Sequence, residues 1–190
     1  MLDPKTIRGE FPALSRMHKG RPVVYFDGPG GTQVPRACID AMVDYLSRCN
    51  ANTHGQFGTS RETDQLLQET RETVAAFLGA PSWREISFGA NMTTLCFALS
   101  RALVRAWQPG DEVVITQLDH EANRGPWLML EEKGVVVREV VLRPDGRLDP
   151  EDMTRKIGKR TRIVALGMAS NALGTVNDVA LARRLSQHVG

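Results

Sequence analysis

The sequence predicts an α/β fold built on a mostly parallel sheet flanked by helices. From Val23 onward, short apolar runs of strand length alternate with amphipathic stretches long enough for helices, which is the pattern of parallel strands joined by helical crossovers. Hydrophobic residues make up 42% and charged residues 24% of the 190 residues, as in an ordinary globular chain. This composition excludes a disordered tail, a collagen-like repeat and a disulfide-stapled miniprotein.

The first elements are predicted between residues 23 and 79. Residues 23–26 are rich in β-branched and aromatic side chains and predict a strand, which ends at a Gly- and Pro-rich loop, 27–31. Apolar residues at helical spacing predict a helix over 35–49. After a polar loop, a second helix is predicted with Ser60 as its N-cap residue and Gly79 as its C-terminal stop.

The remaining elements continue the alternation of strand and helix. Runs of β-branched and apolar residues predict further strands at 85–88, 113–115, 135–142 and 162–166. Helical periodicity predicts helices at about 93–107, about 124–133, from Pro150 onward, and at 179–188.

We divide the chain into an N-terminal segment, 1–22, and part of a larger domain, 23–190. Because the sequence stops where a helix would turn back into another strand, we expect the C-terminal half of this sheet domain to be absent.

Charge, hydropathy and cysteine spacing exclude several kinds of partner. The formal net charge is +2 and no run of Lys or Arg exceeds two residues, so we expect no nucleic-acid partner. No stretch approaches the roughly 18 apolar residues of a membrane helix, so no membrane partner is expected. Cys38, Cys49 and Cys96 match no zinc or redox motif, which predicts no metal site and a reducing, cytoplasmic location.

The loop at residues 89–94 is the first candidate site, because it leaves a predicted strand and opens a predicted helix. The free N–H groups and the positive dipole end of a helix bind anions, and Thr93 and Thr94 add hydroxyls. The alternative is a simple cap, with Asn91 or Thr93 as the N-cap residue. The segment matches neither a Walker loop nor GxGxxG.

Two further loops follow predicted strands, where ligands gather in parallel sheets. His120 lies between Asp119 and Glu121, whose charges would favour the protonated imidazole if they lie close; the alternative is a solvated loop histidine. Asn171 could donate a hydrogen bond to a ligand oxygen or merely hold its own turn. The glycines of the loops 27–32 and 52–56 permit close backbone approach but are also ordinary turn residues.

Four stretches, taken together and in this order, resemble a known family. They read YFDGPGGTQVP at 25–35, MTT at 92–94, HEAN at 120–123 and SNALGT at 170–175. They are similar to the class V aminotransferase group of fold-type I pyridoxal-phosphate (PLP) enzymes, and most of all to its cysteine desulfurase and selenocysteine lyase-like branch. The resemblance extends from about residue 11 to residue 190 and implies the large domain of that fold.

The resemblance also implies roles for particular residues. Met92, Thr93 and Thr94 match the segment that binds the PLP phosphate. His120 matches the histidine that stacks over the pyridine ring and takes part in proton transfer, and Asn171 matches the asparagine that hydrogen-bonds the phenolic oxygen of the ring.

A substrate-side loop and two departures from the family pattern complete the match. Gly28, Gly30 and Gly31 match the family's substrate-side loop. Glu121 stands where many relatives have a second histidine or another residue, and Met92 where they have glycine or serine.

Several residues that the family needs have no match in this sequence. These are the Schiff-base lysine, the aspartate at the ring nitrogen, the persulfide-forming cysteine and the arginine that binds the substrate carboxylate. None of the five lysines, Lys5, Lys19, Lys133, Lys156 and Lys159, lies in a matching motif. We therefore expect the 190-residue chain to be inactive on its own.

For the full-length protein, the resemblance implies cleavage of the C–S bond of an amino-acid substrate, giving alanine and a persulfide. It also implies a homodimer and a sulfur-acceptor protein as partner. Elimination or epimerisation remains open, because kynureninase-like and isopenicillin-epimerase-like enzymes share much of this half. The sequence is also compatible with a non-catalytic truncated module and with a phosphate-binding α/β domain unrelated to PLP.

Overall fold

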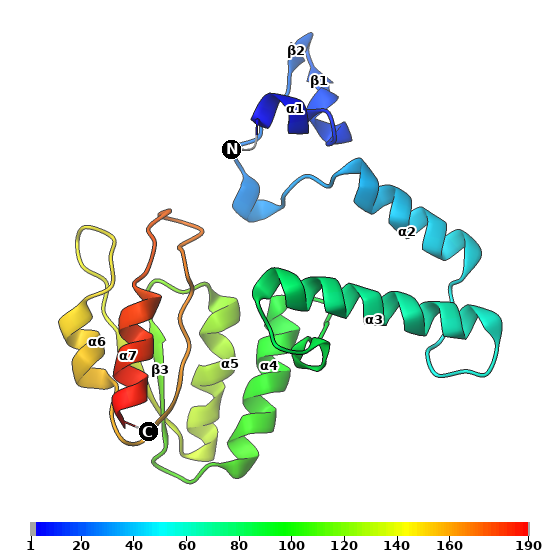
Figure 1. Cartoon of the computed structure of the whole chain (residues 1–190). Helices are drawn as coiled ribbons and strands as arrows, with labels where there is room; N and C mark the ends of the chain where they lie inside the picture. Colours follow the sequence, from blue (N-terminus) through cyan, green and yellow to red (C-terminus); the bar gives the residue numbers. More distant parts are fainter. Residues whose placement is uncertain (1–2, 190) are drawn as a thin grey trace. The chain divides into compact units, whose positions relative to one another are not determined.

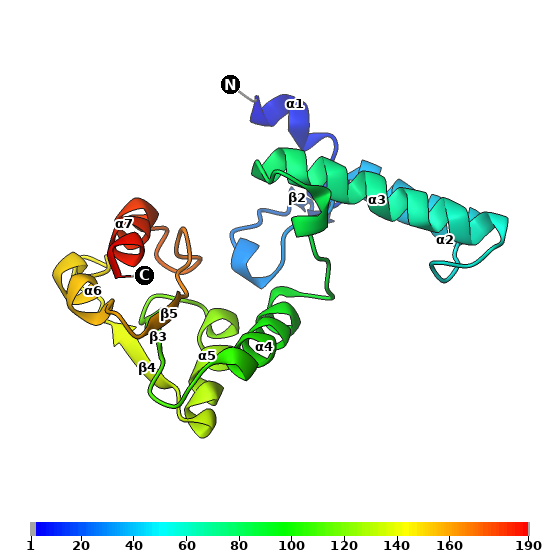
Figure 2. The same ribbon diagram turned by 60° about the horizontal axis from the view of Figure 1, so that its bottom comes forward.

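A computed structural model describes residues 3–189 and divides the chain into two compact units (Figures 1 and 2). They are the N-terminal unit, Met1–Ser87, and the C-terminal unit, Phe88–Gly190. This boundary differs from the division predicted after residue 22. The reason is that every strand of the parallel sheet lies beyond Ser87, whereas the residues before it form helices and one short hairpin.

The N-terminal unit consists of helices and a small hairpin. In chain order its elements are α1 (Pro4–Arg8), β1 (Met17–His18), β2 (Arg21–Pro22), α2 (Arg36–Arg48) and α3 (Gly58–Leu78). The antiparallel hairpin turns through Lys19 and Gly20, which both have positive φ (48° and 75°), as a tight two-residue turn requires. Gly79 ends α3 in the left-handed conformation, φ 70°, which confirms the predicted stop.

Two predicted strands of this region are not formed. At residues 23–26, the Val23 N–H donates to the Arg16 carbonyl at 2.9 Å, but residues 24–26 make no backbone hydrogen bond within the described chain. At 85–88, the Ser82 hydroxyl accepts from the Arg84 N–H and opens a 3-10 turn, Trp83–Glu85, instead. A β-rich sequence becomes a strand only where another strand pairs with it, and the sheets formed by residues 3–189 include neither segment.

Ser60 is not the N-cap residue of α3. The helix begins at Gly58, and Ser60 is fully buried inside its first turn. Its hydroxyl donates to the Asn52 carbonyl at 2.6 Å and accepts from the Gly55 N–H at 2.7 Å. Ser60 therefore closes the loop that precedes the helix rather than capping the helix.

The C-terminal unit contains a three-stranded parallel sheet of order β4-β3-β5. Its elements, in chain order, are α4 (Met92–Leu103), β3 (Glu112–Thr116), α5 (Gly125–Leu128), β4 (Val136–Val140), α6 (Pro150–Lys156), β5 (Thr161–Val164) and α7 (Val179–Val189). This sheet confirms the predicted fold class.

Both faces of the sheet are covered, because side chains alternate along the central strand. Val113 and Ile115 of β3 pack in one cluster with Trp127 and Leu130, while Val114 packs in a second cluster with residues of α6 and α7. Figure 1 accordingly shows α4 and α5 on one side of β3 and α6 and α7 on the other. A strand buried on both faces suits a parallel sheet.

The helix predicted at 124–133 is broken in the structure. The chain forms a 3-10 helix at Glu121–Asn123, the short α5, and another 3-10 helix at Met129–Lys133. Pro126 lies at the start of α5 and offers no N–H group to continue a helix from the preceding turn. None of the helices formed by residues 3–189 combines the length and the apolar character needed to span a membrane.

Candidate functional site

The three segments that resemble cofactor-contacting motifs reach the same edge of the sheet in the C-terminal unit. β3 and β5 are parallel, so the loops that follow them, which carry His120 and Asn171, leave the sheet at its carboxyl edge. Helix α4 ends before a turn into β3 and runs back along the sheet, so its first residues lie at the carboxyl edge as well (Figure 1).

The start of α4 presents hydrogen-bond donors that no residue of 3–189 accepts from. Asn91 caps the helix, its side-chain oxygen accepting from the Thr94 N–H at 2.9 Å, which confirms one of the two predicted caps. Within the described chain, no hydrogen bond is formed by the N–H groups of Met92 and Thr93 or by the hydroxyls of Thr93 and Thr94. All three residues, Met92, Thr93 and Thr94, are exposed, so the helix start can bind an anion.

His120 is exposed at the N-cap position of the 3-10 helix that follows β3. Its Nδ1 accepts a hydrogen bond from the Ala122 N–H at 3.0 Å. A ring nitrogen that accepts carries no proton, so this bond selects the neutral tautomer with the proton on Nε2. The imidazole is thus anchored at one nitrogen, and Nε2 makes no hydrogen bond with residues 3–189.

The carboxylates of the two acids beside His120 bind other residues. The Asp119 carboxylate binds Thr116, Asn123 and the Gly167 N–H. Glu121 pairs with Arg124 at 3.1 Å.

The ion pairs of Arg124 account for the position of Glu121. Arg124 also binds Glu139 of β4, and that hydrogen bond holds the pKa of Arg124 above its ordinary value. Glu121 is therefore the outer member of a surface ion-pair cluster.

Asn171 lies on a short hairpin loop that another residue holds. The Ser170 hydroxyl accepts from the N–H groups of Ala172 and Leu173 at 3.3 and 3.1 Å. The Asn171 side chain is exposed and forms no hydrogen bond among the described residues. The turn-holding role therefore belongs to Ser170, and the amide of Asn171 remains available to a ligand.

Gly28, Gly30 and Gly31 belong to the N-terminal unit. Gly28–Gly30 forms a 3-10 turn, and Gly31 has a φ of 147°, which favours glycine. A Cβ at Gly28 or Gly30 would meet no atom of the described chain within 4 Å. Their role as a substrate-side loop stays a prediction.

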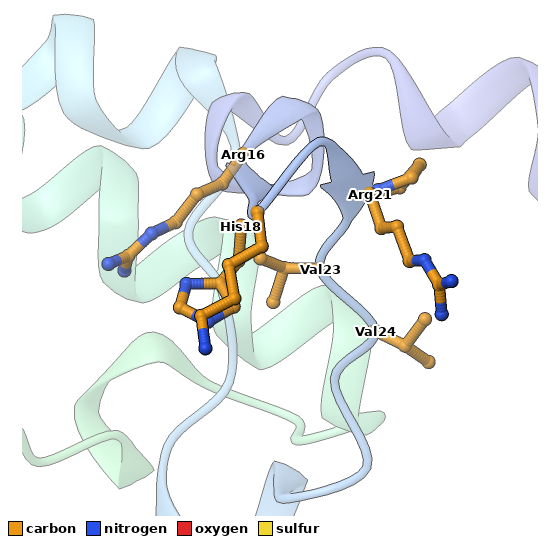
Figure 3. Close-up of a pocket in the computed structure, with 7 residues that line it drawn as sticks. Arg16, His18, Arg21, Val23 and Val24 are labelled. Carbon is orange, nitrogen blue, oxygen red and sulfur yellow. The ribbon is translucent and has the colours of Figure 1, made fainter.

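A cavity of about 710 Å³ lies at the β1–β2 hairpin of the N-terminal unit, lined by basic and apolar side chains (Figure 3). Figure 3 shows Arg16 and His18 directed to one side of the hairpin and Arg21 to the other. The side chains of Arg16 and Arg21 therefore do not converge on one point of the cavity. Residues 3–189 also contain no group of three or more His, Cys, Asp or Glu side chains that could hold a metal ion.

Sequence reasoning does not find the residues that hold the site together. Asp119 and Ser170 attract attention only as neighbours of His120 and Asn171, and Asn177 lies in no motif. The Gly167 N–H donates to the Asp119 carboxylate, and the Asn177 side-chain amide donates to the Gly167 carbonyl. Both hydrogen bonds connect residues that are far apart in the sequence. Neither hydrophobic periodicity nor a local motif predicts such pairs. A carboxylate next to a candidate imidazole is the available signal, but it suggests an effect on charge rather than a hydrogen-bonding role.

Comparisons with known proteins show the family of this chain. The aminotransferase class-V family profile matches residues 24–190. Cysteine desulfurase from Serratia proteamaculans (strain 568) is 39% identical over 176 residues, which cover 91% of this chain and 43% of that protein. A probable cysteine desulfurase from Streptomyces coelicolor is 36% identical over 198 aligned positions, covering 100% of this chain and 47% of that protein.

Solved structures show the same likeness. The apo structure of cysteine desulfurase from Thermococcus onnurineus NA1 matches with a TM-score of 0.88 at 29% identity, over 100% of this chain and 46% of that one. The cysteine desulfurase CsdA of Escherichia coli matches with a TM-score of 0.81 at 27% identity, over 100% of this chain and 47% of that one. The chain thus spans about half the length of the relatives it matches, and it belongs to the aminotransferase class-V family.

Proposed function

We propose that this chain is the N-terminal, cofactor-contacting part of a PLP-dependent cysteine desulfurase-like enzyme. The observation that carries the proposal is the convergence of the α4 start, the His120 loop and the Asn171 loop on one edge of a parallel sheet. The relatives named above support the choice of reaction, because they are cysteine desulfurases.

The donors at this edge fit PLP chemically. A phosphate dianion suits the N–H groups of Met92 and Thr93 and the hydroxyl of Thr94 at a helix start. A planar ring suits the exposed, anchored imidazole of His120, and a phenolic oxygen suits the amide of Asn171. When bound, the cofactor would supply an electron sink for chemistry at the substrate.

His120 would orient the ring and hold a proton near it. Its Nδ1 is engaged by the Ala122 N–H, so Nε2 carries the proton of the neutral ring and is the nitrogen that can donate a hydrogen bond. The backbone hydrogen bond fixes the ring plane, which reduces the entropy lost when the imidazole stacks on a flat partner.

The Schiff-base lysine is, in our proposal, none of the five lysines of this chain. In the C-terminal unit, Lys133 and Lys159 lie within three residues of the starts of β4 and β5, at the opposite edge of the sheet. The Lys156 amine is held by the Asp152 carboxylate and the Glu139 carbonyl. Reading the coding frame beyond the Gly190 codon tests this: the proposal expects a further sheet strand and a lysine, whereas an immediate stop codon would contradict an active enzyme.

For the whole enzyme we propose desulfuration of an amino acid, with alanine and a persulfide as products. A homodimer and a sulfur-acceptor protein are further parts of the proposal, supported by the family membership. The cytoplasm is the proposed location, since Cys38, Cys49 and Cys96 are all free thiols, as is usual in a reducing compartment.

The phosphate contact is tested with 4′-deoxypyridoxine 5′-phosphate, which has the ring, the phenolic oxygen and the phosphate but no aldehyde to modify lysines. Thr94→Val should weaken its binding to the chain about tenfold, because a hydrogen bond to a charged group is lost while the shape is kept. Thr154→Val, on the exposed face of α6, is the matched control. Unchanged affinity in Thr94→Val, measured by calorimetry, would count against the phosphate assignment.

The ring contact is tested with His120→Ala and the same probe. His120 is exposed but accepts from the Ala122 N–H as an N-cap residue, so its truncation should lower the free energy of unfolding by only about 1 kcal/mol. Binding of the probe should nevertheless weaken severalfold. If the substitution instead unfolds the C-terminal unit, as seen by circular dichroism, His120 has a structural role and the assignment is wrong.

A further inference from the structure

The Asp119 carboxylate joins two loops of the candidate site. One oxygen, Oδ1, accepts from the Gly167 N–H at 2.7 Å and from the Asn123 side-chain amide at 3.1 Å. The other, Oδ2, accepts from the Thr116 hydroxyl at the end of β3. Asp119 thus links its own loop, which continues into His120, with the chain that leaves β5.

Gly167 has no side chain that would block this contact. A Cβ at this position would lie 2.8 Å from Asp119 Oδ1, closer than van der Waals contact permits, so only glycine admits the carboxylate at its present distance. On its other side, the Gly167 carbonyl accepts from the Asn177 side-chain amide at 2.7 Å. Both polar groups of the Gly167 backbone are therefore used to fix the base of the next loop.

That loop is a closed hairpin. The Asn177 N–H donates to the Met168 carbonyl at 3.0 Å, and Ala169 and Val176 form an antiparallel bridge above it. The Ser170 N–H donates to the Thr175 carbonyl at 2.9 Å. Asn171 lies in the turn of this hairpin, so a hydrogen bond at Gly167 fixes where Asn171 stands.

We propose that Asp119 is a positioning residue that sets the spacing between His120 and Asn171 at the cofactor ring. This inference rests on the proposed function, in which both residues contact the same PLP molecule. Asp119 does not touch that cofactor. It acts by holding the His120 loop and the Asn171 hairpin to each other through Gly167.

The proposal requires that the side chain at position 119 keep its hydrogen bonds, and it does not require a negative charge there. In Asp119→Asn the amide oxygen can still accept from Gly167 and Asn123, and its NH₂ group can donate to the Thr116 hydroxyl, which also accepts. Asp119→Ala removes all three hydrogen bonds. Glu131→Ala is the matched control, because Glu131 is an exposed acid of the same unit whose side chain makes no hydrogen bond or ion pair with residues 3–189.

The experiment uses the 190-residue chain labelled with ¹⁵N. It compares amide hydrogen exchange at Gly167, the ring ¹⁵N shifts of His120, and the affinity for 4′-deoxypyridoxine 5′-phosphate. Asp119→Ala should speed exchange at Gly167 about tenfold and move the His120 shifts toward an average of both tautomers. The affinity should fall severalfold in Asp119→Ala and return in Asp119→Asn.

Three outcomes would overturn the proposal. Asp119→Ala could behave like Glu131→Ala at Gly167, which would show that the carboxylate does not hold the hairpin. Asp119→Asn could lose probe affinity as fully as Asp119→Ala, which would show that charge rather than position matters. If Asp119→Ala fails to fold, Asn177→Ala replaces it, and unchanged probe affinity in that variant would contradict positioning through Gly167.

The failure of the proposed function would look different. In that case the unmodified chain would not bind the probe at the carboxyl edge, while exchange at Gly167 would still respond to Asp119→Ala. The hydrogen-exchange measurement therefore tests whether Asp119 connects the two loops. The binding measurement tests whether that connection supports cofactor binding.

Discussion

The central strand β3 and the helix α2 show what an apolar pattern does and does not determine. All five residues of β3 are buried, in a sheet covered on both faces. Helix α2 carries an equally regular apolar stripe, Ile39, Met42, Val43 and Leu46, yet these side chains are 37–65% exposed and the helix buries no residue. Periodicity specifies the element, whereas burial needs a surface that packs against it.

Because β3 is buried and the apolar stripe of α2 is exposed, we expect truncation of a β3 side chain to have the largest effect on stability. Ile115 is fully buried, so Ile115→Ala should lower the free energy of unfolding of the C-terminal unit by about 3 kcal/mol. Amide exchange of the β3 and β4 hydrogen bonds, resolved by NMR, measures this unit without averaging over the other. A loss below about 1 kcal/mol would show that the sheet is much less tightly packed than its burial indicates.

A smaller loss of stability is expected from a substitution at Glu112, the first residue of β3. The Glu112 carboxylate is buried and binds Arg138 at 2.8 Å and Arg160 at 3.1 Å. The hydrogen bond from Arg138 is the main cause that lowers the pKa of Glu112. Glu112→Gln should cost roughly 1–2 kcal/mol at pH 7, since a charge-assisted hydrogen bond is lost.

The pH dependence of that cost gives a sharper test. Because the pKa of Glu112 is lower in the folded than in the unfolded chain, its contribution is fully present above the unfolded value of about 4.3. It is lost as the pH falls through the lower, folded-state pKa. The stability difference between the two proteins should therefore be constant near neutrality and shrink in acid, and a difference that grows in acid would contradict this ion pair.

The smallest effect is expected on α2. Leu46 is 62% exposed, so Leu46→Ala should change the free energy of unfolding by less than about 0.5 kcal/mol. Thermal unfolding followed by circular dichroism in the far ultraviolet measures it beside Ile115→Ala. A loss comparable with that of Ile115→Ala would mean that the α2 stripe is packed in solution.

The sequence is most informative where local rules suffice. The parallel sheet, the Asn91 cap and the Gly79 stop follow from periodicity and capping chemistry, and all three are present. The strands predicted at 23–26 and 85–88 fail because strand formation depends on a pairing partner that propensity cannot supply. Ser60 misleads for a related reason, since its hydroxyl bonds to Asn52 and Gly55 rather than to its own helix.

The candidate site likewise contains residues that the sequence predicts and contacts that it does not predict. His120 and the Met92–Thr94 segment are predictable from loops that follow or precede elements in a parallel sheet, a rule of topology. The contacts of Asp119 with Gly167, and of Gly167 with Asn177, are not predictable from the sequence. They join separate parts of the chain through single hydrogen bonds. Such bonds become visible only once the fold brings the loops together.

The central claim is that three separate segments form one cofactor-contacting edge. The most direct measurement is a titration of the ¹⁵N-labelled chain with 4′-deoxypyridoxine 5′-phosphate, followed by NMR, with phosphate-free 4-deoxypyridoxine as control. The account predicts that the amides of Met92–Thr94, His120 and Asn171 shift together with one dissociation constant, and that the control binds much more weakly. Shifts confined to the basic hairpin at Arg16–Arg21, or different dissociation constants for the three segments, would contradict it.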